Sequence, residues 1–178
     1  MIVRNTTANL SWTPLSGAPP LAAVRKSGTP PAHAAPVPPV AILGIVFDPV
    51  TLTQAVAEVQ TMIASGRPHH LVTANLDFLM QAFHDVELRR IMLDADRVLC
   101  DGTPLLWASQ LFDNPLPERV AGSDLVPALL EAAAERGYRP FFLGGAPEVA
   151  AEAVAKVQIR FPRLNVAGYY SPPVRTLL

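Results

Sequence analysis

Short apolar runs alternate with longer segments of helical periodicity from Val40 onward. Apolar runs bounded by Gly, Pro, Asp or Ser predict strands, whereas apolar residues spaced three and four apart predict helices. The predicted strands cover residues 41–47, 70–73, 97–100, 140–143 and 165–169. Strands separated by helices of this length favour βαβ units, and the pattern therefore predicts an α/β fold with a parallel sheet.

Helix ends carry their own signals. Thr51 with Gln54 three residues later predicts a capping box, and Ser65-Gly66 predicts the end of that helix. The other predicted helices run from about Leu76 to Leu93 with a break at His84-Asp85, over 104–112, from an N-cap at Ser123 to Gly137, and from Pro147 to about Arg160.

The first 39 residues differ in composition from the rest of the chain. They are rich in Pro, Ala, Ser and Thr and contain no Asp or Glu. Such a segment buries too little apolar surface to offset its ordering entropy, which predicts a disordered, partly polyproline-like tail over 1–39 and one domain over 40–178. A transit peptide is the alternative, although the proline density argues against an amphipathic helix.

Charge, cysteine content and hydropathy bear on the expected partner, compartment and membrane topology of the protein. The net charge is −1, which gives no electrostatic reason to expect a nucleic-acid partner. Cys100 is the single cysteine, so no internal disulfide forms, and a reducing compartment is indicated. No apolar run approaches the ~20 residues that span a bilayer.

Polar residues follow two of the predicted strands. Asp101-Gly102 comes directly after 97–100, Thr73 ends the run at 70–73, and Asn75 follows two residues later. Ligands of open α/β sheets bind beyond the carboxyl ends of the strands. Asp101 is therefore a candidate general base, Gly102 a point of close ligand approach, and Thr73 and Asn75 candidate partners for sugar hydroxyls or an acetamido group. The alternative for Asp101, Thr73 and Asn75 is helix capping.

Two further segments are candidates for phosphate binding. The turn Gly144-Gly145 leads into a helix N-terminus, where N–H groups attract anions, although glycines also serve tight turns. Arg119 has the planar guanidinium that matches a diphosphate, and its alternative is a surface ion pair with Glu118 or Asp124.

Three other features are weaker candidates. Asp94-Ala95-Asp96 has the D-x-D spacing of a metal site but precedes its strand, away from the expected pocket. His69-His70 also precedes a strand and has no further ligand spacing. Cys100 lies inside a strand, which favours a buried structural thiol over a nucleophile.

Taken together, these motifs resemble the WecG/TagA/CpsF family of bacterial glycosyltransferases over residues 42–173. The resemblance is densest at 72–77, 95–98, 101–102, 117–125 and 142–145. It implies a Rossmann-like parallel sheet flanked by helices, and transfer of an N-acetylmannosamine-type sugar or a hexose from a UDP-sugar donor to a saccharide on a polyprenyl diphosphate. It also implies Asp101 as the catalytic base, Thr73 and Asn75 in the sugar pocket, and Arg119 as the arginine that follows the pocket helix. It implies neither a metal nor another cofactor.

Family members usually continue beyond this point with another strand, a Gly-x-Pro-Lys-Gln-Glu-like segment and a basic appendage. The chain stops at Leu178, and we therefore expect it to lack this C-terminal part. The resemblance places the protein in the cytoplasm, peripherally at the inner face of the membrane, and an exposed sheet edge favours self-association. A non-catalytic remnant or interaction module is the alternative function. A nucleotide-dependent oxidoreductase is disfavoured because the first strand lacks a G-x-G-x-x-G turn.

Overall fold

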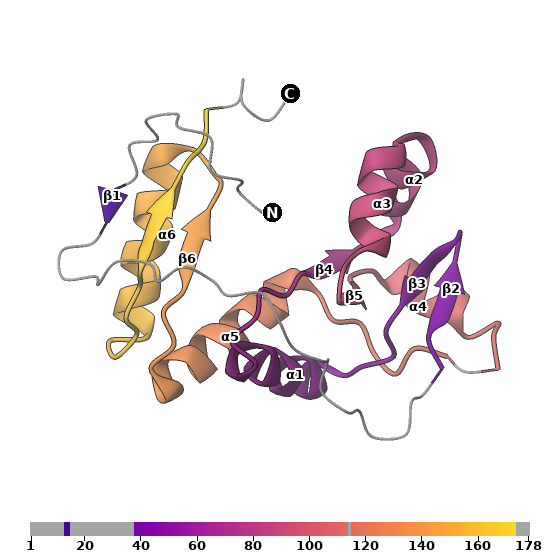
Figure 1. Cartoon of the computed structure of the whole chain (residues 1–178), viewed down its shortest axis with the longest axis horizontal. Helices are drawn as coiled ribbons and strands as arrows, with labels where there is room; N and C mark the ends of the chain where they lie inside the picture. The colour runs from indigo at the N-terminus through magenta and orange to yellow at the C-terminus, as the bar shows by residue number, and fades with distance from the viewer. Residues whose placement is uncertain (1–12, 15–37, 114, 174–178) are drawn as a thin grey trace. The chain divides into compact units, whose positions relative to one another are not determined.

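A computed structural model describes residues 13–14, 38–113 and 115–173. These residues fall into two compact units. The first unit holds 38–126, and the second holds 127–173 together with 13–14. Figure 1 shows the helices and strands of both, and each unit is described by itself below.

The first unit opens with a β-hairpin, so the prediction of a single strand over 41–47 was wrong. Strands β2 (Val40–Ile42) and β3 (Ile45–Phe47) pair antiparallel. The two turn residues, Leu43 and Gly44, have φ values of 50° and 76°. Two successive positive φ angles form the tight turn that suits a twisted hairpin. The apolar run concealed this reversal because a single glycine marks the turn.

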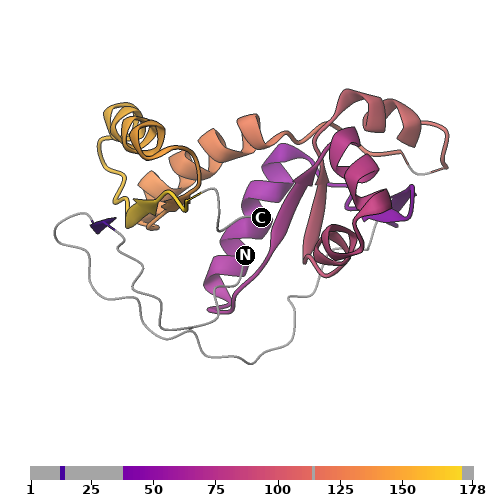
Figure 2. The ribbon, with the colours of Figure 1, turned by 90° about the horizontal axis from the view of Figure 1, so that it is seen from above.

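Helix α1 (Leu52–Ala64) follows the hairpin. Thr51 accepts a hydrogen bond from the Gln54 amide, and the Gln54 side chain accepts one from the Thr51 amide, which confirms the predicted capping box. The helix ends at Ser65, also as predicted. Figure 2 shows α1 beside the strands of this unit, and an ion pair between Glu58 and Arg97 joins it to β5.

The central pair of the first unit is parallel, as predicted. It consists of β4 (Leu71–Ala74) and β5 (Arg97–Cys100), with the register Thr73 opposite Leu99. Helices α2 (Leu76–His84) and α3 (Val86–Leu93) connect the two strands and lie side by side. The break predicted at His84-Asp85 is confirmed, because the Asp85 side chain caps α3.

Two helices differ in their ends from the prediction. Helix α4 (Thr103–Ser109) stops before the expected Phe112, and the buried Ser109 hydroxyl then accepts the Leu116 amide and fixes the loop that follows. Helix α5 (Gly122–Arg136) begins one residue before the predicted N-cap, Ser123. Gly137, with φ 74°, follows its last turn as expected.

The second unit contains a βαβ element. Strands β6 (Phe141–Leu143) and β7 (Gly168–Tyr170) are parallel, with α6 (Pro147–Arg160) between them in sequence and packed against both. The last strand was predicted slightly earlier, at 165–169. The short β1 (Thr13–Pro14) pairs antiparallel with β7.

These units confirm the predicted α/β class, with parallel strand pairs that alternate with helices. The predicted tail over 1–39 lies outside the described residues except at 13–14 and 38–39, and the domain boundary stays a prediction. Within the described ranges, every helix is too short or too polar to cross a membrane.

Candidate functional site

The polar residues predicted at the strand ends meet in the first unit. The Asp101 amide donates to the carbonyl of Ala74 (2.9 Å), so the ladder of β4 and β5 continues one residue beyond β5. This contact brings Asp101 beside the end of β4, where Thr73 and Asn75 lie. Gly102 is close to Asn75, since a Cβ atom on Gly102 would lie 3.7 Å from the Asn75 Cα and Cβ atoms. The predicted cluster therefore exists at the carboxyl ends of both strands.

A third segment, residues 118–122, completes this cluster. The Val120 amide donates to the carbonyl of Cys100 (2.8 Å), which fixes the segment alongside the end of β5. Two residues later, the Gly122 amide donates to Asp101 Oδ2 (3.1 Å). The Asp101 carboxylate is thus held in place while 28% of its side chain stays exposed to solvent.

Gly122 lies within this cluster, although the sequence analysis did not single it out. A Cβ atom at this position would lie 3.2 Å from Thr73 Oγ1 and 3.8 Å from Asp101 Oδ2. The missing side chain therefore leaves space between the Thr73 hydroxyl and the Asp101 carboxylate. The available signal was a glycine directly before the polar start of a helix, which is too common to identify a site.

Arg119 lies beside Asp101 and is partly exposed to solvent. Its guanidinium is 3.9 Å from Asp101 Oδ1 and forms a 2.7 Å ion pair with Asp124, while 41% of the Arg119 side chain remains exposed. The pairing with Asp124 that we considered as an alternative is present. It coexists with the approach to Asp101, so a cation lies beside the candidate base, and its role toward a diphosphate stays a prediction.

Asn75 caps a helix, as its alternative interpretation predicted. Its side-chain oxygen accepts the Phe78 amide (3.0 Å) at the start of α2. The cap uses only the oxygen of the carboxamide, and the amide nitrogen carries two further donors. Capping and ligand binding are therefore compatible, and the sugar-pocket role of Asn75 and Thr73 stays a prediction.

Cys100 lies buried directly before Asp101. Burial is the main cause that raises the pKa of its thiol, and the nearby Asp101 carboxylate raises it further. The Sγ atom lies 3.6 Å from the Gly102 carbonyl, which it faces as a donor. A protonated, buried thiol is a packing group rather than a nucleophile.

Gly144 and Gly145 belong to the second unit, between β6 and α6. Both have positive φ, 119° and 71°, and the Gly144 amide donates to the Tyr170 carbonyl (2.9 Å). The N-cap residue Ala146 offers no side-chain cap to α6. This turn retains the features of an anion site, and its role toward phosphate stays a prediction.

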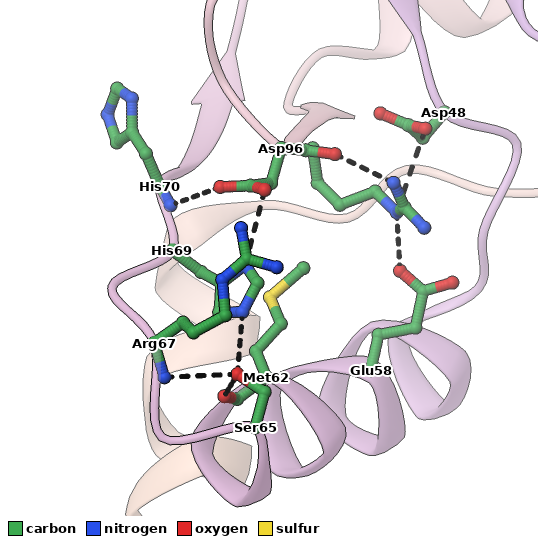
Figure 3. A network of polar contacts seen from close by, with 9 residues as sticks. Asp48, Glu58, Met62, Ser65, Arg67, His69, His70 and Asp96 are labelled. Carbon is green, nitrogen blue, oxygen red and sulfur yellow. Dashed lines mark hydrogen bonds and ion pairs between the residues drawn. The ribbon is translucent and has the colours of Figure 1, made fainter. Parts of the chain in front are cut away.

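The residues that precede β4 and β5 form a separate polar network (Figure 3). His69 Nδ1 lies 3.2 Å from Asp96 Oδ1, and its Nε2 lies 2.9 Å from Ser65 Oγ. The Ser65 hydroxyl donates to the Met62 carbonyl (2.7 Å), so it accepts from His69. Because its hydroxyl proton is directed to the Met62 carbonyl in the last turn of α1, Ser65 has no proton to give to His69. This arrangement argues against a Ser–His–Asp catalytic triad.

The two carboxylates of the D-x-D segment, Asp94 and Asp96, contact different partners. Asp94 forms an ion pair with Arg90 (3.4 Å), and Asp96 accepts the His70 amide (2.8 Å). Among the described residues, no group of three or more His, Cys, Asp or Glu side chains is placed to hold a metal ion.

We expect the Asp96 network to make stability depend on acid pH. Partial burial raises the pKa of Asp96, but the His70 amide, His69 and Arg67 together lower it below the ordinary value. A lowered folded-state pKa stabilises the fold above the unfolded-state pKa, about 3.9, and that contribution is lost as pH falls through the folded-state pKa. Urea unfolding should show Asp96→Asn as less stable than wild type at pH 7, with the difference shrinking below pH ~4.

Asp94→Asn is the matched control for this experiment, because Asp94 is 69% exposed and pairs only with Arg90 in the same helical segment among the described contacts. Its effect should be small at both pH values. A difference between wild type and Asp96→Asn that stays constant down to pH 2 would contradict the assignment.

Comparison with known proteins places the chain in a family. The family described as "Glycosyl transferase WecG/TagA/CpsF family" matches residues 40–176. The N-acetylglucosaminyldiphosphoundecaprenol N-acetyl-beta-D-mannosaminyltransferase of Bacillus spizizenii is 34% identical over 119 residues, which is 66% of this chain and 46% of that protein. The enzyme of the same name from Staphylococcus aureus strain NCTC 8325 is 30% identical over 131 residues, 72% of this chain and 52% of its own length. The chain therefore spans about half the length of these relatives.

Proposed function

This chain belongs to the WecG/TagA/CpsF family of glycosyl transferases, and we propose that it transfers a sugar from a UDP-sugar to a saccharide carried on a polyprenyl diphosphate. The proposal is supported by one observation above all. Asp101, Thr73, Asn75 and Arg119, which come from three separate segments of the sequence, lie together at one end of β4 and β5.

The proposed reaction assigns one step to each charged side chain. An acceptor hydroxyl attacks the anomeric carbon, a new C–O bond forms, and the bond from that carbon to the diphosphate oxygen breaks. Asp101 takes the hydroxyl proton as general base. The electron pair leaves with UDP, and the Arg119 guanidinium, near Asp101, stabilises the added negative charge on the diphosphate.

The relatives suggest the identities of donor and acceptor. Their names describe transfer of N-acetylmannosamine to N-acetylglucosaminyl-diphosphoundecaprenol. We propose the same sugar class for this chain, with the Thr73 hydroxyl and the Asn75 amide as partners of the donor sugar. A lipid-linked acceptor requires the site to work at the membrane surface, and we propose peripheral attachment at the inner face.

Titration of UDP and UDP-N-acetylhexosamines into the purified chain tests this function directly. We expect saturable binding in the micromolar-to-millimolar range usual for enzyme substrates, about 1 μM–1 mM, and transfer to a short-chain analogue of the lipid acceptor. ADP and GDP are matched controls, because they carry the diphosphate without the uracil base. The absence of saturable UDP binding would contradict the proposal and favour a non-catalytic interaction module.

A further inference from the structure

Glu118 precedes Arg119 in the third segment of the site, and the structure gives it a distant partner. Its half-buried carboxylate accepts the backbone amide of Leu52, the first residue of α1. The sequence analysis offered Glu118 as a surface partner of Arg119. The structure instead directs the two neighbouring side chains to different places, Arg119 to Asp101 and Asp124, and Glu118 to the start of α1.

The start of α1 is a favourable place for this carboxylate. The first amides of a helix have no partner within the helix, and the helix dipole attracts negative charge there. The capping box of Thr51 and Gln54 satisfies the amides of these two residues. Leu52 lies between them, and Glu118 supplies the acceptor for its amide.

The start of α1 is itself fixed to β5. The Asp48 amide donates to the Val98 carbonyl (2.9 Å), and the Val98 amide donates to Asp48 Oδ2 (2.8 Å). On the other side of Glu118, the Val120 amide donates to the Cys100 carbonyl. These contacts form a closed ring that runs from β5 through Asp48 to α1, through Glu118 to the third segment, and back to β5.

We propose that Glu118 is a positioning residue that holds the segment 118–122 against Asp101. The proposal rests on the function proposed above. Without the contact to Leu52, the segment keeps only its attachments on the C-terminal side of Arg119, at the end of β5. The Arg119 guanidinium and the Gly122 amide then lose one of their two anchors. Both groups face the Asp101 carboxylate. Glu118 thereby sets the electrostatic surroundings of the candidate base without touching it.

Amide hydrogen exchange of the full chain, followed by NMR, tests this proposal without any need for activity. In Glu118→Ala we expect exchange of the Leu52 and Gly122 amides to accelerate by roughly tenfold relative to the core amide of Leu99, the change that ~1.4 kcal/mol less protection produces. Glu118→Gln should restore slow exchange, because its side-chain oxygen also accepts the Leu52 amide. Unchanged exchange at Gly122 in the alanine variant would overturn the proposal.

UDP affinity provides the second readout. Glu118→Ala should weaken UDP binding by about tenfold, because Arg119 loses one of the two anchors of its segment, with Glu118→Gln near wild type. Glu135→Ala, an exposed position on α5, is the matched control and should change neither readout. If wild type binds no UDP, the proposed function fails while the exchange data still decide the role of Glu118. If Glu118→Ala does not fold, Glu118→Asp, which is one methylene shorter, serves the same comparison.

Discussion

Asp101→Asn should reduce sugar transfer by about 10²–10⁴-fold, the usual contribution of a general base. Asparagine has nearly the same shape, and its side-chain oxygen can still accept the Gly122 amide that now bonds Asp101 Oδ2. It cannot take a proton from the acceptor hydroxyl. The loss should therefore appear in kcat, while UDP affinity stays within about threefold of wild type because the base acts in the chemical step.

Steady-state transfer assays and UDP titrations, carried out on the same preparations, would check this prediction. Asp94→Asn is a suitable control, since it removes an exposed carboxylate from the opposite end of β5. Transfer by Asp101→Asn at the wild-type rate would exclude Asp101 as the base, even with the family membership unchanged.

Phe47→Ala should destabilise the first unit by about 3–5 kcal/mol, the cost of truncating a buried phenylalanine. Phe47 is fully buried in β3. Its core cluster includes Ala74 and Cys100, the last residues of β4 and β5. Because native proteins are stable by only about 5–15 kcal/mol, a loss of this size threatens the unit that carries the candidate site.

Urea unfolding followed by circular dichroism would measure this effect. Phe83→Ala is the matched control, since Phe83 is 66% exposed on α2 and the same atoms are removed. We expect the control to stay within about 1 kcal/mol of wild type. Equal destabilisation by both substitutions would show that Phe47 does not contribute to the core as the structure indicates.

Local signals in the sequence were sufficient for much of the fold. The Thr51–Gln54 capping box and the strand 97–100 are found as predicted, because each depends on residues within a few positions of one another. The hairpin of β2 and β3 was missed for a local reason as well. Its turn has one glycine, and Leu43 adopts a positive φ that leucine disfavours, so composition alone gave no sign of the reversal.

The candidate site was predictable only in part. Asp101, Thr73 and Asn75 could be placed because parallel strands bring their carboxyl ends to one edge. Gly122 and Glu118 could not, since their contacts join residues 21 and 66 positions apart. Such contacts depend on the path of the loop after α4, for which no periodicity exists. The predicted role of the Gly144-Gly145 turn remains to be tested in the second unit.

The way Asn75 caps α2 also restricts the chemistry that a ligand meets at this position. The Phe78 amide uses one of the two lone pairs of the side-chain oxygen, so the carboxamide keeps one lone pair and two hydrogens for a ligand. A substrate group that brings a lone pair, as the carbonyl of an N-acetyl substituent does, can accept one of these hydrogens without touching the helix cap. A protonated amine of a deacetylated sugar would have to share the oxygen with the Phe78 amide. Under the proposed role of Asn75, a free amino sugar would therefore compete with the bond that starts the helix, whereas an acetylated sugar would not.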